Sequence, residues 1–284
     1  MHILQAIIMG VVQGLSEFLP ISSSAHLVIA SNLYKVFTGM ELSQESSQEI
    51  FLDIMLHLGT LAAVLIYFRK DIWNIIKAFG IAVKTSDFSS KEAKLALYIL
   101  LGTLITVFIA FPLHNAAETL VFSPAIVGLL LIGTGILLFL SETYSKKIAE
   151  KSENIDLKTS VFIAIAQGLA ALPGFSRSGL TIAAGLLSKK ERTAAARYSF
   201  LLSIPIILGA SMFYPLIKID MSEFSGYNWK AIISGTFVSA VVGYLCIKYF
   251  LKFVGKYSLA FFGYYCIIVG IGTFVFFNIF AGKI

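Results

Sequence analysis

The stretch LPISSSAH at residues 19–26 interrupts an apolar run that extends from residue 3 to residue 33, and LPGFSRSG at residues 172–179 interrupts a second, from 161 to 187. Each run has roughly ten apolar residues before its break and fewer after it, so each arm as a helix is about 10 to 15 Å long and reaches only the centre of a hydrocarbon layer about 30 Å thick. Each interrupted run is therefore predicted to form a re-entrant hairpin of two half-helices.

The sequence around these breaks is too apolar for a soluble protein. Hydrophobic residues make up 57% of the 284 residues and charged residues 13%, and the mean hydropathy is +0.85. Too few polar side chains remain to cover a soluble fold, which excludes soluble enzymes. Six other runs are each long enough to cross a bilayer as a helix: residues 51–68, 95–113, 124–140, 198–217, 229–249 and 259–280. We expect an all-α integral membrane protein with six transmembrane helices and two re-entrant hairpins.

The two interrupted runs also resemble each other. QGL, LP and SSS at residues 13–15, 19–20 and 22–24 correspond to QGL, LP and SRS at residues 167–169, 172–173 and 176–178. A single membrane domain, 1–284, is therefore predicted to contain two repeats, approximately 1–141 and 159–284. Each repeat has a hairpin and then three spans, and because three is odd, the second repeat must enter the membrane inverted relative to the first.

Basic residues are distributed unevenly between the two ends of the predicted spans. Seventeen of the 22 Lys and Arg residues fall on one predicted side, in segments 69–94, 142–158, 188–197 and 248–257. The positive-inside rule makes that side cytoplasmic, so the N-terminus and the first hairpin lie on the outer side and the polar tips meet near the bilayer centre. The net charge of +6 is then mostly a matter of topology, and no nucleic-acid partner is needed.

Other general features of the sequence suggest no further chemistry. Cys246 and Cys266 lie inside apolar runs, without the spacing of a disulfide framework or a metal site. The N-terminal segment lacks a basic n-region and a cleavage site, so it is expected to remain in the mature protein. The many Tyr and Phe residues are ordinary for lipid-facing and interfacial positions.

Polar side chains at the first break form the first half of a candidate site. Glu17 lies one helical turn after Gln13 in an apolar arm, where a carboxylate is costly unless it faces a cavity or a partner. The alternative is a Glu that reaches the outer surface from the end of a short arm. Alone, the serine run 22–24 would indicate a helix cap, and His26 an interior histidine with satisfied hydrogen bonds.

Arg177 at the second break changes this interpretation. An unpaired guanidinium between apolar segments is prohibitively costly, whereas its five donors match phosphate oxygens. Ser176, Ser178 and Thr181 supply neutral donors beside the expected start of a helix, whose dipole also favours an anion.

Together the two breaks contain the groups needed for phosphoryl transfer. Glu17 and His26 can manage protons or a water, and Ser23 can act as a nucleophile. Arg177 can stabilise charge on the transferring group. The alternative is an ion pair between Glu17 and Arg177 that merely pins the hairpins together, but it explains neither the clustered serines nor His26. No Walker A motif is present, so the substrate is expected to reside in the membrane itself.

Other polar residues are weaker candidates. Asp53 and His57 lie one helical turn apart and could line the same cavity, although Asp53, near the outer end of its span, could equally be solvated. Four residues fall at segment ends and are expected to be solvated: His2, His114, Glu118 and Glu142.

Two segments resemble a known family specifically. GVVQGLSEFLPISSSAH, residues 10–26, and ALPGFSRSGLTIAAGLL, residues 171–187, are similar to the two signature motifs of the undecaprenyl-diphosphate phosphatase family of bacteria, also known for bacitracin resistance. FLDIMLHLGTLAAVLIYF, from residue 51, resembles the family's next segment, and the resemblance spans the whole chain. Two positions depart from the commonest pattern. Gln13 stands where the family allows Glu or Gln, which leaves Glu17 as the one certain acid, and Ser24-Ala25 replaces Thr-Gly.

The resemblance implies hydrolysis of the diphosphate of the C55 polyprenyl carrier lipid to its monophosphate, with release of inorganic phosphate, at the outer face of the bacterial plasma membrane. It implies catalytic roles for Glu17, Ser23, His26 and Arg177. It places six side chains around the diphosphate: Gln13, Ser22, Ser24, Ser176, Ser178 and Thr181. It also implies a divalent cation, and with one certain carboxylate we expect Mg²⁺ or Ca²⁺ to arrive bound to substrate oxygens.

A transporter is the alternative from another functional class, because inverted repeats with broken helices also build transporter sites. A lipid-carrier flippase or an anion carrier would share Arg177 and the helix ends, but would have no use for Ser23 beside an acid–base set. A purely structural scaffold is excluded by the cost of burying Arg177. The sequence leaves open whether Ser23 or a water attacks, whether the product is also moved across the bilayer, and whether the chain forms a homodimer.

Overall fold

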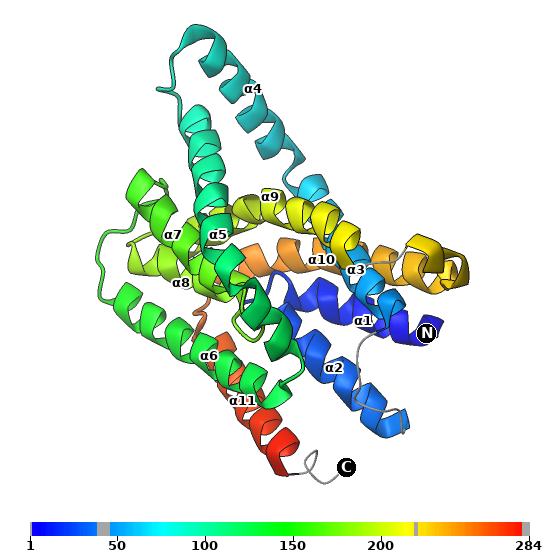
Figure 1. Ribbon diagram of the computed structural model, residues 1–284. Helices are drawn as coiled ribbons and strands as arrows, with labels where there is room; N and C mark the ends of the chain where they lie inside the picture. The colour runs from blue at the N-terminus through cyan, green and yellow to red at the C-terminus, as the bar shows by residue number, and fades with distance from the viewer. Residues whose placement is uncertain (1, 39–45, 219–220, 280–284) are drawn as a thin grey trace.

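The computed structural model describes residues 2–38, 46–218 and 221–279. Within these ranges the regular structure is helical, apart from one isolated bridge between Ser152 and Lys190 (Figure 1). The helices there are α1 (Ile3–Ser16), α2 (Ser23–Thr38), α3 (Ser47–Tyr67), α4 (Arg69–Thr85), α5 (Lys91–Val121), α6 (Pro124–Lys146), α7 (Leu157–Leu169), α8 (Arg177–Leu187), α9 (Arg192–Lys218), the 3₁₀ helix η1 (Met221–Gly226), α10 (Trp229–Val254) and α11 (Ala260–Ile279).

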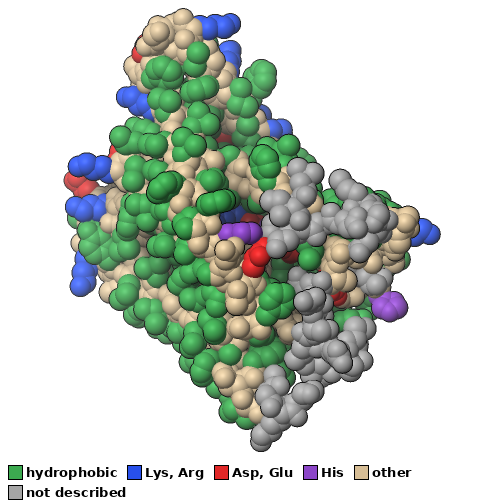
Figure 2. Space-filling model, in the orientation of Figure 1, with side chains coloured by type: hydrophobic (Ala, Val, Ile, Leu, Met, Phe, Trp, Pro, Cys, Tyr) green, Lys and Arg blue, Asp and Glu red, His purple; other side chains and the backbone are tan. Residues whose placement is uncertain are grey.

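Six of these helices are long and apolar enough to cross a membrane: α3, α5, α6, α9, α10 and α11. They coincide with the six runs predicted from the sequence, which confirms a multi-pass, all-α membrane protein. Their outer faces are apolar, as at Phe108 and Phe111 of α5, which are almost fully exposed. Figure 2 shows hydrophobic side chains over most of the visible face, with Lys and Arg gathered near α4 and along the edge beside α7 and α8.

Each interrupted run forms two short helices joined by a turn, residues 17–22 in the first and 170–176 in the second. Their arms are longer than the sequence suggests, because α1 and α7 continue through the polar residues before each break; their 14 and 13 residues extend about 20 Å. Both turns use left-handed backbone, with φ of 69° at Ser22 and 105° at Gly174. Glycine adopts this conformation freely, whereas a serine does so only at some cost.

Helix α4 lies in segment 69–94, for which the sequence predicts an excess of basic residues between two spans but no helix. Asp71 in its first turn and Lys84 in its last turn complement the helix dipole. The helix packs against α5 and projects with it from the rest of the bundle (Figure 1). An ion pair of 2.8 Å between Asp71 and Arg197 ties it to α9.

The expectation that Glu142 is solvated is wrong. Its side chain is 1% exposed and accepts hydrogen bonds of 2.7 Å from both Nε and Nη2 of Arg192. It also accepts a bond of 3.0 Å from the backbone N–H of Leu259. Glu142 thus joins the end of α6 to the starts of α9 and α11. Neighbouring helices cover this segment end, which sequence position alone does not reveal.

The second hairpin is closed at its base by Asp156 and Lys190, which lie 2.5 Å apart. Asp156 also caps α7 by accepting the N–H of Thr159 at 2.9 Å. Partial burial raises the pKa of Asp156, but the hydrogen bonds from Lys190 and Thr159 outweigh this effect and hold the pKa below its usual value. The base of the hairpin is therefore ionically clamped at neutral pH.

Glycines let the longest helix contacts form. α1 packs along α10, and α6 packs along α11, with backbones close enough that a methyl group on one helix would strike the other. A methyl carbon added to Gly270 would lie 2.5 Å from the carbonyl oxygen of Gly128, whereas one added to Gly272 would meet nothing within 4 Å. Close approach through small residues is how helices associate where no hydrophobic effect drives them together.

Gly270→Ala should therefore destabilise the protein, and Gly272→Ala on the same helix is the matched control. Both changes add helix propensity, so the difference between them isolates the clash with α6. We expect Gly270→Ala to cost about 1 to 3 kcal/mol, measured as a lower midpoint of thermal unfolding in detergent. Equal midpoints for the two variants would contradict this account of the α6–α11 contact.

Candidate active site

The turns of the two hairpins lie in contact, as expected from the sequence. The hydroxyl of Ser178 donates to the carbonyl oxygen of Leu19 at 2.8 Å, and that of Ser22 donates to the carbonyl of Phe175 at 3.3 Å. Segments about 150 residues apart in the chain are thereby held side by side. The starts of α2 and α8 consequently meet at one place.

A buried ion pair lies at this junction. Nη2 of Arg177 is 2.6 Å from Oε1 of Glu17, whose side chain is 7% exposed, against 17% for the arginine. The other carboxylate oxygen accepts hydrogen bonds from the hydroxyl of Ser23 at 2.7 Å and from the amide of Gln13 at 3.1 Å. Arg177 also donates from Nη1 to the carbonyl of Ser199 at 3.5 Å. Glu17 thus links the hydroxyl of Ser23 to the guanidinium.

Helix α3 contributes His57 and Asp53 to the surroundings of Glu17. Nε2 of His57 is 3.8 Å from Oε2 of Glu17, and its Nδ1 is 3.6 Å from Oδ1 of Asp53. The Asp53 carboxylate is half-exposed, which fits the expectation that it could be solvated. The structure therefore brings His57 to the Glu17 carboxylate, and Asp53 lies behind it, beside the other ring nitrogen.

The ring nitrogens of His26 are hydrogen-bonded to groups other than the Ser23 hydroxyl. Its Nδ1 lies 2.8 Å from the carbonyl oxygen of Ser22, and its Nε2 lies 2.8 Å from the hydroxyl of Tyr265 in α11. Both ring nitrogens therefore have partners outside the Ser23, Glu17 and Arg177 chain. In this arrangement Glu17, rather than His26, is the group that accepts the hydrogen bond of Ser23.

Most of the neutral side chains assigned to the diphosphate are buried and bonded to the protein. Ser176 caps α8 by accepting the N–H of Gly179 at 3.0 Å, and Thr181 bonds to Ser199 at 2.6 Å. The buried set is Gln13, Ser22, Ser176, Ser178 and Thr181. Of the residues predicted to be catalytic or to bind the diphosphate, four remain partly exposed: Ser23, Ser24, His26 and Arg177. The buried hydroxyls hold the turns in shape, and the partly exposed residues are available to a ligand.

Three residues that contact the site have no signal in the sequence. Tyr265 and Ser199 lie within apolar spans, where a single Tyr or Ser is unremarkable. Thr134 of α6 accepts the N–H of Ser176 at 3.0 Å and so supports the second turn. Only the packing of α6, α9 and α11 around the turns reveals these contacts.

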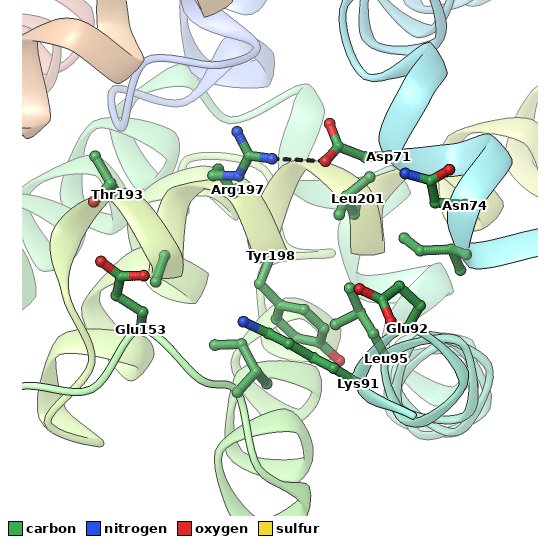
Figure 3. A pocket seen from close by; sticks show the side chains of 13 residues that line it. Asp71, Asn74, Lys91, Glu92, Leu95, Glu153, Thr193, Arg197, Tyr198 and Leu201 are labelled. Carbon is green, nitrogen blue, oxygen red and sulfur yellow. Dashed lines mark hydrogen bonds and ion pairs between the residues drawn. The ribbon is translucent and has the colours of Figure 1, made fainter. Parts of the chain in front are cut away.

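A separate cavity of about 450 Å³ lies between α4, α5 and α9 (Figure 3). Its lining includes Tyr198 and the ion pair between Arg197 and Asp71, and Lys91, Glu92 and Glu153 add both signs of charge. Glu17, Ser23, His26 and Arg177 are not among its lining residues. The chemistry of the hairpin junction is therefore not housed in this cavity.

The junction has the groups that displacement at phosphorus requires. A carboxylate that accepts the hydrogen bond of a serine can take its proton, and a guanidinium beside it can bind anionic oxygens. In the described part of the chain no group of three or more His, Cys, Asp or Glu side chains could hold a metal ion. Glu17, the most buried carboxylate of the junction, already forms an ion pair with Arg177. These residues do not fit a resident divalent cation.

Comparison with known families identifies the chain. A family model described as "Bacitracin resistance protein BacA" matches residues 6–272, which is nearly the whole sequence. The chain belongs to this family. Members from Methanobrevibacter smithii and Halothermothrix orenii, both named undecaprenyl-diphosphatase, are each 40% identical to it, over 97% and 99% of this chain and 98% and 100% of their own lengths. A third, from Korarchaeum cryptofilum, bears the same name and is 42% identical over 95% of this chain and 98% of its own.

Proposed function

We propose that this protein hydrolyses undecaprenyl diphosphate to undecaprenyl phosphate and inorganic phosphate, and so recycles the lipid carrier for cell-wall synthesis. The observation that carries the proposal is the Ser23–Glu17–Arg177 chain at the hairpin junction, in a member of a family whose named relatives are undecaprenyl-diphosphatases. A serine, a base and a cation are the minimum for covalent phosphoryl transfer.

In the proposed reaction the hydroxyl oxygen of Ser23 attacks the terminal phosphorus, and its proton passes to Glu17. The bond to the bridging oxygen breaks, and undecaprenyl phosphate leaves. A water then attacks the phosphoserine, releasing inorganic phosphate and restoring the serine. Arg177 stabilises the charge on the phosphoryl oxygens in both steps, and His26 is the second group able to exchange protons.

A divalent cation has no step of its own in this mechanism. The protein residues at the junction supply no ligand set for one, and Glu17 is bound to Arg177. We propose that Mg²⁺ or Ca²⁺ reaches the site only when it is bound to the diphosphate oxygens of the substrate.

Arg177→Ala should lower phosphate release from a polyprenyl diphosphate about 10²- to 10³-fold, because it removes a preorganised donor to charge that develops in the transition state. Arg177→Lys should restore little, since a lysine lacks the forked donors. Arg197→Ala is the control, because Arg197 pairs with Asp71 away from the junction. The measurement is phosphate release by detergent-purified protein of verified folding. Retention of more than a tenth of the normal turnover by Arg177→Ala would contradict the role.

The covalent route predicts a phosphoserine at Ser23. Rapid acid quench of the enzyme with substrate labelled in the terminal phosphate should trap label on the protein, and Ser23→Ala should abolish activity. A direct attack by water would leave Ser23 as a hydrogen-bond donor only, and its loss would then cost about 10²-fold or less. Unlabelled protein under single-turnover conditions, together with measurable activity of Ser23→Ala, would exclude the covalent route.

If the protein were a transporter, the wild type would release no phosphate. A flippase or anion carrier built on the same helices would move its ligand without releasing phosphate. The bond of 2.7 Å between Ser23 and Glu17 favours the hydrolase, because a binding site for transport needs no activated hydroxyl. Phosphate release by the purified wild type separates the two functions.

We further propose that the two hairpins are re-entrant and that residues 1–141 and 159–284 form inverted repeats. The hairpins exchange partners between these halves: α1 of the first packs on α10 of the second, and α7 of the second packs on α5 of the first. α1 and α7, at about 20 Å each, are also short for a hydrocarbon layer of about 30 Å. Such mutual packing is what a pair of inverted copies would produce.

The proposed location is the bacterial plasma membrane, with the N-terminus and active site toward the outer face. The excess of Lys and Arg in segments 69–94, 142–158, 188–197 and 248–257 supports this orientation. The segment between α5 and α6 would then face outward, and α4 would face the cytoplasm.

Single cysteines test this orientation in intact cells after Cys246 and Cys266 are replaced by alanine. Asn115→Cys near the outer end of α5 should react with a membrane-impermeant thiol reagent. Lys84→Cys and Lys151→Cys should react only after the cells are opened. Labelling of the last two alone in intact cells would reverse the orientation.

A further inference from the structure

Tyr265 makes a hydrogen bond that determines the state of the His26 ring. Nδ1 of His26 lies 2.8 Å from the carbonyl oxygen of Ser22, which can only accept, so Nδ1 carries the proton. Nε2 of the neutral ring then offers a lone pair to the Tyr265 hydroxyl at 2.8 Å, and the tyrosine is the donor. The two rings also lie nearly parallel, with centroids 5.6 Å apart.

The neighbouring residue of α11 holds the other side of the same turn. The thiol of Cys266 donates to the carbonyl oxygen of Pro20 at 3.4 Å. Consecutive residues of α11 therefore contact the first hairpin on both sides of Ser22 and Ser23, Cys266 at the turn and Tyr265 at α2. Because α11 is packed along α6 through glycine contacts, Tyr265 is carried by a rigid element.

The bond has a consequence for proton transfer. Nδ1 is committed to the backbone of Ser22, so a proton can be gained or lost only at Nε2. The Tyr265 hydroxyl is the hydrogen-bond partner of Nε2 and so helps to fix the orientation of the ring. Tyr265 is 37% exposed and His26 is partly exposed, so the pair is not enclosed in the interior of the bundle.

We propose that Tyr265 is a positioning residue for His26: its hydroxyl donates to Nε2 and fixes the orientation of the ring, in which the Nδ1 bond to Ser22 leaves Nε2 as the proton-exchanging atom. The effect on turnover rests on the proposed function, whereas the hydrogen bond to Nε2 can be measured without it. Tyr265 acts through His26 and needs no contact with the substrate.

Tyr265→Phe tests the proposal, with Tyr264→Phe as the matched control. The first variant keeps the stacked ring and removes only the hydroxyl. Tyr264 is the adjacent residue and packs on Phe139 instead, with ring centroids 5.7 Å apart. We expect Tyr265→Phe to lower kcat about three- to tenfold, the rate equivalent of one ordinary hydrogen bond, with KM changed less than twofold. Tyr264→Phe should change neither.

Nitrogen-15 NMR of histidine-labelled protein in detergent supplies a readout independent of turnover. The sequence has four histidines, so the His26 signals can be assigned from their loss in His26→Gln. The wild type should show Nδ1 protonated and Nε2 as a hydrogen-bonded acceptor. In Tyr265→Phe the Nε2 signal should move while Nδ1 stays protonated, and unchanged signals from His57 and His114 will show that the fold is intact.

Three results would overturn the proposal: an Nε2 signal that does not respond to Tyr265→Phe, an equal response to Tyr264→Phe, or a shifted signal with kcat unchanged. A wild type that releases no phosphate would refute the proposed function instead. The nitrogen spectra would still decide, in that case, whether Tyr265 holds Nε2 of His26.

Discussion

The ion pair between Glu17 and Arg177 is the constraint on which the rest of the site depends. Each charge comes from a different hairpin, and each alone would cost several kcal/mol to bury in an apolar environment. Their contact at 2.6 Å makes both burials tolerable and at the same time requires the two turns to touch. The hydrogen bonds from Ser178 to Leu19 and from Ser22 to Phe175 complete that contact without adding charge.

The same polar residues therefore serve two purposes, which the structure divides among them. Buried hydroxyls, such as those of Ser178 and Thr181, form hydrogen bonds within the protein and hold the turns in place. Ser23 and Arg177 occupy the middle positions of the matching triplets SSS and SRS, and both remain partly exposed beside Glu17. In the proposed mechanism the start of α2 supplies the nucleophile and the start of α8 supplies the cation, so the two hairpins make a single asymmetric site.

Helix packing around the turns adds what the turns lack. α11 supplies Tyr265 to His26, α3 brings His57 to within 3.8 Å of Glu17, and α9 offers a carbonyl to Arg177. None of these spans contains the signature segments, yet each contributes one polar group to the junction. The apolar remainder of each span is free to face lipid or the bundle interior.

Several features follow from the sequence alone because they depend on local composition. Uninterrupted apolar length predicts the six spans, and a Pro followed by serines marks each turn. A lone Arg177 in apolar surroundings demands a counter-charge, and the carboxylate of Glu17 is the natural candidate for such an internal ion pair. The family motifs around these residues indicate phosphatase chemistry.

Other features depend on which distant segments pack together, and only the tertiary structure decides them. Glu142 lies at the end of a span, where water is the default partner, but Arg192 and Leu259 cover it. Tyr265 looks like any interfacial tyrosine until α11 packs beside the first turn. Hydropathy and motif spacing indicate the environment that a residue needs, whereas its partner is determined by helix contacts between residues fifty or more positions apart.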